Sequence, residues 1–173
     1  MALTVEDGTI VSGADSYGSE AGFAAYATSM NWTLGGDATS QEADMRRAAA
    51  YLDRTYKWIG IRSDAAQNMQ WPRYYEELVE GYPLDSSTIP DAIVTAQYEI
   101  AWIFNQGNDL FAYDTTAAVK RLREKVGQIE VETEYATDSS VESRLLSVEG
   151  LLRPYITGGS PGSTFGQVTV LRS

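Results

Sequence analysis

The 173-residue chain is long enough for one domain with a hydrophobic core, and its composition, 43% hydrophobic and 11% aromatic, excludes general disorder. The absence of cysteine and histidine excludes disulfides, thiolate metal sites and the commonest general base, so we expect no enzyme, no cofactor and no metal site. The formal net charge of −11 repels phosphate backbones and argues against free nucleic-acid binding.

The first 30 residues are predicted to form an arm followed by a helix. Gly8 and Gly13 interrupt the short apolar pieces of residues 1–14, so we expect an extended N-terminal arm. Apolar residues recur at helical spacing from about Ser19 to Met30, which predicts the first helix.

The second helix has the clearest pattern in the chain. Thr39 and Glu42 have the spacing of a capping box, in which each side chain accepts a hydrogen bond from the backbone of the other. One apolar stripe follows, formed by Met45, Ala48, Ala49, Leu52 and Tyr56. The stripe predicts that this helix packs on the core along one face.

Residues 58–88 show no sustained periodicity, and we expect a long loop of functional importance. Within it, Trp71, Pro72 and Arg73 have two interpretations. In the first, Trp71 stacks on a nucleic-acid base and Arg73 holds a phosphate. In the second, which we favour, burial of Trp71 contributes about 2–3 kcal/mol and anchors the loop, Pro72 stiffens it, and Arg73 pairs with a carboxylate.

Carboxylates in the same stretch offer the remaining route to catalysis. Glu76, Glu77 and Asp85 lie near Tyr74 and Tyr75 and would supply the acid–base pair of a small hydrolase. Adjacent glutamates in a polar loop are more typical of a solvated charge run. Hydrolysis is therefore only our third hypothesis, and we predict no catalytic residue.

A third helix is predicted to begin at Ile89-Pro90-Asp91, because proline is well tolerated in the first helical turn. From Ile93 to Phe104 the sequence is apolar on nearly every face, and Gly107 ends the helix. A helix with this pattern lies at the centre of a fold.

A β-hairpin is predicted at about residues 119–135, around the two-residue turn Gly127-Gln128. This turn places cations opposite anions on one face in three pairs: Arg121 with Glu134, Arg123 with Glu132, and Lys125 with Glu130. A helix over Ala117–Val126 is an alternative that the sequence leaves open for the first half.

The last quarter combines a helix with an arm. Ser139 and Glu142 form a second capping box, which predicts a helix to about Pro154. Residues 157–163 have the composition of a flexible linker, and the apolar residues beyond it have no core left to join. We therefore expect a helical domain over residues 1–156 and a flexible C-terminal arm over residues 157–173. The predicted fold is mainly α, a small four-helix bundle with the inserted hairpin and extended N- and C-terminal arms.

Three stretches resemble a tailed-phage protein family: YLDRTY at residues 51–56, AQNMQWPR at residues 66–73, and Ile89-Pro90 at the start of an apolar helix. Members are often labelled DnaT-like single-stranded-DNA-binding proteins, and many belong to the head–tail module. The stretch EKVGQIEVE at residues 124–132 also resembles the hairpin of phage head–tail connector, or adaptor, proteins. Together the matches span about residues 40–155.

The resemblance implies a structural virion protein of the neck, made in the host bacterial cytoplasm, that joins the DNA-filled capsid to the tail. Such adaptors form a ring, usually of twelve copies, beneath the portal protein, and they receive a stopper or tail-completion protein on the opposite side. Double-stranded DNA would pass through the channel without specific binding. Independently of the resemblance, no apolar run approaches the roughly 20 residues that a membrane span needs, so we expect no membrane partner. The family label gives the alternative function, a single-stranded-DNA-binding replication accessory protein.

The resemblance also assigns two contact surfaces. The expected subunit contact is the charged face of the hairpin, formed by Arg121, Arg123, Lys125, Glu130, Glu132 and Glu134. The expected portal contact is the C-terminal arm, through Phe165, Val168, Val170 and Leu171. The resemblance assigns no catalytic residue.

Overall fold

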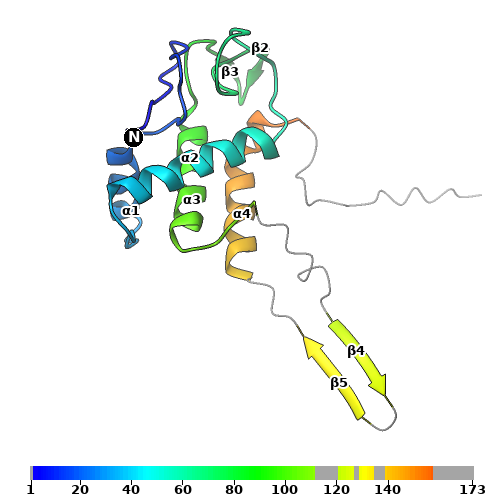
Figure 1. Cartoon of the computed structure of the whole chain (residues 1–173). Coiled ribbons are helices and arrows are strands. Elements are labelled where there is room, and N and C mark those ends of the chain that lie inside the picture. Colours follow the sequence, from blue (N-terminus) through cyan, green and yellow to red (C-terminus); the bar gives the residue numbers. More distant parts are fainter. Residues whose placement is uncertain (1, 112–120, 127–128, 135–138, 158–173) are drawn as a thin grey trace, which may run out of the picture.

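The computed structural model describes residues 2–111, 121–126, 129–134 and 139–157 (Figure 1). Its helices are α1 (Glu20–Ser29), α2 (Ala38–Thr55), α3 (Asp91–Asn105) and α4 (Ser139–Leu152), which the short 3-10 helix η1 (Arg153–Tyr155) extends. In Figure 1, α2 runs across α3 and α4, and α1 lies at the end of α2 nearest the N-terminus. None of the described helices is long and apolar enough to cross a membrane.

The prediction of a four-helix bundle is wrong, because residues 58–88 contain an antiparallel three-stranded sheet rather than a loop. Its strands β1 (Ile61–Arg62), β2 (Arg73–Val79) and β3 (Tyr82–Leu84) pair in the order β1-β2-β3. The sequence of β2, RYYEELV, does not alternate between apolar and polar residues. Most of the sheet is exposed, so the period-2 burial pattern by which strands are recognised is absent.

The N-terminal segment is packed against the body, which corrects the expectation of an extended arm. Glu6 is 1% exposed, and its carboxylate accepts hydrogen bonds from the amides of Gly8 (2.9 Å), Ile10 (3.0 Å) and Val11 (2.9 Å). Tyr17 belongs to the hydrophobic core. The single buried carboxylate of Glu6 thus accepts hydrogen bonds from three amides of a turn that lies outside every helix and strand.

The helix boundaries agree with the periodicity but not with the predicted caps. The N-cap of α2 is Asp37, whose carboxylate accepts a hydrogen bond from the amide of Ser40 at 2.9 Å. Thr39 lies inside the first turn, so the capping box of Thr39 and Glu42 is not formed. Ser139 is likewise the first residue of α4 rather than its cap.

The core lies between α2, α3 and α4, and it includes the two tryptophans Trp58 and Trp71. The apolar stripe predicted for α2 is buried in full. The central position predicted for α3 is confirmed, since it buries residues on several faces: Ile93, Ala96, Gln97, Glu99, Ile100, Ala101, Ile103 and Phe104. Gly22 of α1 lies so close to Tyr98 of α3 that a Cβ would fall 2.2 Å from the Tyr98 hydroxyl oxygen.

The predicted hairpin is confirmed in its backbone pairing. Strands β4 (Arg121–Val126) and β5 (Ile129–Glu134) are antiparallel, with Arg121 opposite Glu134, Arg123 opposite Glu132 and Lys125 opposite Glu130. This register is the one that the charge pattern predicts, and it excludes a helix over residues 121–126. In Figure 1 the hairpin stands apart from the helices.

Candidate functional site

Trp71 and Arg73 hold the chain before β2 against the helical body. The Trp71 side chain is 0% exposed, and its ring meets those of Trp58 and Tyr155 edge-on, at centroid distances of 5.7 and 5.8 Å. Arg73 donates from Nε to the carbonyl of Ile59 and from Nη2 to that of Gly60, both at 2.7 Å. These partners are carbonyl oxygens, where the sequence predicted a carboxylate. Trp71 presents no open ring face to a base.

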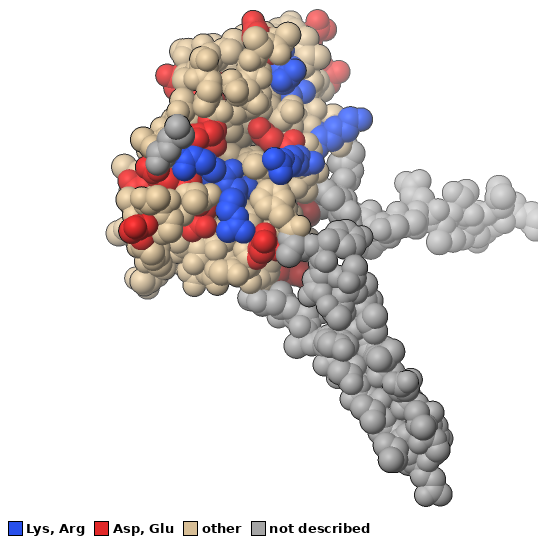
Figure 2. Space-filling model, viewed as in Figure 1, with Lys and Arg blue, Asp and Glu red and all other residues tan. Residues whose placement is uncertain are grey.

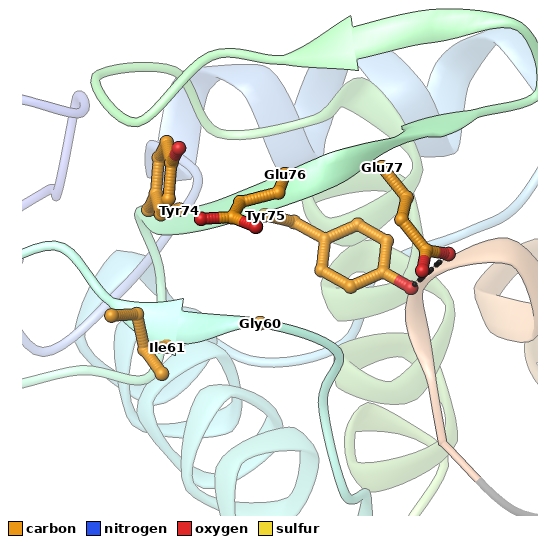
Figure 3. A pocket seen from close by; sticks show the side chains of 6 residues that line it. All are labelled: Gly60, Ile61, Tyr74, Tyr75, Glu76 and Glu77. Atoms are coloured by element: carbon orange, nitrogen blue, oxygen red, sulfur yellow. Dashed lines mark hydrogen bonds between the residues drawn. The ribbon is translucent and has the colours of Figure 1, made fainter.

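The three carboxylates considered for acid–base chemistry have separate surroundings. Glu76 and Glu77 border a shallow hollow on the sheet, and Figure 3 shows their carboxylates pointing in different directions. The Tyr75 hydroxyl donates to Glu77 at 3.0 Å. Asp85 is not among the residues that line this hollow, and it accepts two hydrogen bonds from Ser87, which lower the pKa of its carboxyl. The described residues contain no group of three or more acidic, histidine or cysteine side chains that could hold a metal ion.

A polar pocket of about 360 Å³ lies between α2, the N-terminal segment and the chain before β2. On one side Arg46 forms an ion pair with Asp15, with Nε and Oδ2 2.6 Å apart. On the other, the Asp53 carboxylate accepts hydrogen bonds from the Tyr17 hydroxyl (2.5 Å) and the Gln70 amide (3.2 Å). Burial raises the pKa of Asp53 to about 6, although these hydrogen bonds and two nearby arginines lower it.

Asp53→Asn is expected to remove a pH-dependent loss of stability. The pKa of Asp53 in the folded protein, about 6, lies above its ordinary value of 3.8, so the folded state binds the proton more tightly than the unfolded state. The stability that this group contributes is therefore complete below the ordinary pKa and is lost as the pH rises through about 6.

Chemical denaturation across this pH range measures the effect. The difference in unfolding free energy between the parent protein and the asparagine variant should change as the pH crosses this window and become constant above it. A difference that stays constant from about pH 4 to about pH 8 would contradict the assignment.

A cluster of cations and aromatic rings lies on the outer side of α2. We call it the α2 arginine face, and it consists of Arg47, Tyr51, Arg54 and Phe111. The spacings of four and three residues place Arg47, Tyr51 and Arg54 on one side of the helix. Figure 2 shows Lys and Arg side chains gathered across the middle of the visible surface, where α2 runs in Figure 1, with Asp and Glu around them.

Aromatic rings fix the geometry of the α2 arginine face. Phe111 meets Tyr51 edge-on at 5.9 Å, and the guanidinium carbon of Arg54 lies 5.6 Å from the centre of the Phe111 ring. The guanidinium of Arg47 lies 4.4 Å above Phe104. The Arg47 side chain is 42% exposed and pairs with Asp109, with Nη2 and Oδ1 3.1 Å apart. The arrangement combines exposed positive charge with exposed ring surface.

Of the two contact surfaces expected from the resemblance, the structure describes the backbone of one, the hairpin. The hairpin residues lie on β4 and β5 in the predicted register. The residues Phe165, Val168, Val170 and Leu171 of the C-terminal arm lie outside the described residues. The subunit contact and the portal contact stay predictions.

Sequence reasoning missed the α2 arginine face, although part of its signal is present in the sequence. The spacing of Arg47, Tyr51 and Arg54 on the polar side of a predicted helix identifies a common face. Phe111 follows α3 in the chain, so its place beside α2 depends on how the two helices pack. The net charge of the whole chain gives no information on where Arg47 and Arg54 lie relative to each other.

Comparison with known proteins identifies the family. A family model described as "Putative DnaT-like ssDNA binding protein" matches residues 1–173. No curated protein and no solved structure gives a match. Residues 51–56 and 66–73 resemble a family whose members are often labelled DnaT-like, and the family match agrees with that label. The match gives no support to a function as a head–tail connector. Because it covers the whole length, the chain belongs to the DnaT-like single-stranded-DNA-binding protein family.

Proposed function

We propose that the protein binds single-stranded DNA as an accessory protein and that the α2 arginine face is its contact surface. The whole-chain match to the DnaT-like family carries the proposal, since the description of that family names single-stranded DNA as the ligand. The α2 arginine face supplies what such a ligand requires, namely cations for the phosphates and aromatic rings for the bases.

The geometry of the α2 arginine face suits an extended single strand of DNA. Arg47 and Arg54 are seven residues apart, which separates them by about 10 Å along the axis of α2. Phe111 stacks on Phe104 at 5.7 Å, lies against Arg54 and is 41% exposed, so a base would have to reach the part of the ring that these two contacts leave exposed. Stacking of a base on an aromatic side chain contributes about 1–3 kcal/mol.

The net charge of −11 does not prevent contact at this face, because the effect of distant charges is short-ranged in salt. The Debye length is about 8 Å at physiological ionic strength, so carboxylates on other parts of the surface are largely screened. The acidic residues that matter are the near ones. Asp109 pairs with Arg47 at 3.1 Å and Asp44 lies 3.9 Å from it, so a phosphate must compete with both for this guanidinium. Burial and, to a smaller extent, the nearby carboxylate of Glu149 raise the pKa of the Tyr51 hydroxyl, so a phosphate on this face would also meet a third carboxylate.

Arg47→Ala combined with Arg54→Ala is expected to weaken binding to an oligothymidylate and to reduce its salt dependence. Each phosphate contact that is lost lowers the slope of log affinity against log salt by about 0.7 for a single strand, so the double variant should lose about 1.4. Fluorescence anisotropy at several salt concentrations measures both quantities.

Arg153→Ala is the matched control, because Arg153 is an exposed arginine on η1, outside the α2 arginine face. It should bind like the parent protein. If the parent protein shows no salt-dependent binding, the proposed function is wrong. If the double variant binds as the control does, the ligand contacts another surface.

A second candidate function, the head–tail connector of a tailed phage, is supported by the hairpin. Strands β4 and β5 place three cation–anion pairs on a ribbon that stands apart from the helices, as a contact between identical subunits would require (Figure 1). Mixing the protein with assembled portal, with and without residues 157–173, and imaging the particles tests it. Connector function predicts a ring on the portal that depends on the C-terminal arm, whereas no attachment at all would exclude it.

A further inference from the structure

The polar pocket of about 360 Å³ beside α2 adjoins the α2 arginine face, because Arg54 belongs to both. Its volume falls within the range of about 300–1,000 Å³ that is usual for ligand pockets. Ala50 lines the pocket one helical turn before Arg54, and Phe111 of the α2 arginine face contacts Arg54. A single strand that binds along the α2 arginine face therefore passes beside the pocket.

The charges in the pocket suit a neutral ligand better than a phosphate. Asp15 and Asp53 line it together with Arg46 and Arg54, so the formal charges balance. The guanidinium of Arg46 is engaged by Asp15 at 2.6 Å and by Glu42 at 3.6 Å. A phosphate in the pocket would have to compete with these carboxylates, whereas an uncharged ring would not.

The pocket also contains hydrogen-bonding groups that can still bind a ligand. Each oxygen of the Asp53 carboxylate accepts one hydrogen bond within the protein and can accept a second. The side-chain oxygen of Asn68 accepts from the Gly13 amide at 3.1 Å, and that of Gln70 accepts from Arg73 at 3.0 Å. Within the part of the chain that the structure describes, the side-chain NH₂ groups of Asn68 and Gln70 have no acceptor.

We infer that the pocket takes one base of the bound strand and prefers a base that carries an exocyclic amino group, such as cytosine. This inference rests on the proposed function, because the α2 arginine face brings the strand to the pocket. Ala49, Ala50 and Met69 give the pocket apolar surface on which the ring can pack. The Asp53 carboxylate then accepts a hydrogen bond from N4 of cytosine, the pairing that acidic side chains make with this base.

Thymine suits the same groups less well, although its ring has the same size. It carries the oxygen O4 where cytosine carries the amino group N4, so two acceptors would face each other at Asp53. The NH₂ groups of Asn68 and Gln70 can donate to N3 and O2 of cytosine, whereas N3 of thymine carries a hydrogen. A polar group left without a partner in the pocket weakens binding.

Binding to two oligonucleotides of equal length tests this inference. One is an oligothymidylate, and the other alternates thymidine with cytidine. Equal length gives both strands the same number of phosphates, so the salt-dependent contribution to affinity is the same. In fluorescence anisotropy at about pH 8, where Asp53 is ionised, the parent protein should bind the cytidine-containing strand about tenfold more tightly.

Two variants change the pocket in different ways. Ala50→Leu fills it, and Asn68→Asp replaces the NH₂ donor with an acceptor while keeping an oxygen for the Gly13 amide. Asn68 is exposed, so its replacement leaves the core intact. Both variants should bring the ratio of the two affinities to about one. The control Ala25→Leu changes an exposed alanine of α1, outside the pocket and the α2 arginine face, and should keep the preference of the parent protein.

Equal affinity of the parent protein for the two strands would overturn the inference and leave the proposed function standing. A preference that survives in both pocket variants would also overturn it, because cytosine would then be recognised at another place. If the parent protein binds neither strand, the proposed function is wrong and the inference falls with it.

Discussion

Replacing Gln97 with leucine is expected to lower the free energy of unfolding by at least about 3 kcal/mol, because it leaves several buried polar groups without a partner. Gln97 is 0% exposed and lies in the middle of α3. Its Oε1 accepts hydrogen bonds from the amides of Tyr17 and Gly18, both at 2.9 Å. Its Nε2 donates to the Ser16 hydroxyl at 2.7 Å and to the carbonyl of Met45 at 2.9 Å.

The position of these partners makes the effect larger than that of an ordinary hydrogen bond. Ser16, Tyr17 and Gly18 belong to the segment before α1, and Met45 belongs to α2, so one side chain joins three parts of the chain. Each buried donor or acceptor that loses its partner costs about 1–3 kcal/mol, and leucine can satisfy none of the four. The loss should therefore release the N-terminal segment as well as weaken the core.

Urea denaturation of the Gln97→Leu variant measures the loss, with Gln106→Leu as the control. Gln106 is exposed and caps the C-terminus of α3 through its backbone, so its replacement should change stability by no more than about 0.5 kcal/mol. Equal midpoints for the two variants would show that the hydrogen bonds of Gln97 contribute nothing to the fold.

The parts of the fold that the sequence predicted depend on local patterns. The stripe of α2 and the all-round apolar surface of α3 follow from helical spacing, and both helices bury the expected residues. The hairpin register follows from matching three cations with three anions across a two-residue turn. In each case the signal lies within one or two adjacent elements.

Some parts of the fold that the sequence did not predict depend on tertiary packing. Others depend on which of several equally suitable neighbouring residues takes a structural role. The strand β2 carries Tyr74, Tyr75, Glu76 and Glu77 in a row, and its open sheet imposes no alternation of burial. At the start of α2, Asp37, Thr39 and Ser40 are all good N-cap residues within four positions, so the pattern alone cannot choose Asp37.

The candidate site shows the same division. The common face of Arg47, Tyr51 and Arg54 is a local property of one helix, whereas Phe111 reaches it only because α3 packs on α2. Net charge is a sum over the whole chain, and it conceals how charges are distributed. A chain with 24 acidic residues can still present two of its arginines on one face of a helix.

Trp71→Ala is expected to lower the free energy of unfolding by about 3–5 kcal/mol, the usual cost of truncating a fully buried large aromatic side chain. Trp71 is 0% exposed and contacts Trp58 and Tyr155, so its removal leaves a cavity between the sheet and the end of α4. Trp71→Phe should cost less. The Nε1 of Trp71 has no hydrogen-bond partner among the described residues, so phenylalanine loses packing but no hydrogen bond.

Tyr82→Ala is the control for removing an aromatic side chain that is not buried. Tyr82 lies on β3 of the sheet that follows Trp71, and it is 76% exposed. Its replacement should change stability by no more than about 0.5 kcal/mol. If all three variants unfold at the same urea concentration, Trp71 does not anchor the segment. If only the Trp71→Ala variant is strongly destabilised, the tryptophan between glutamine and proline stabilises the fold through its buried volume. That role explains why a residue so costly to expose lies outside every helix and strand.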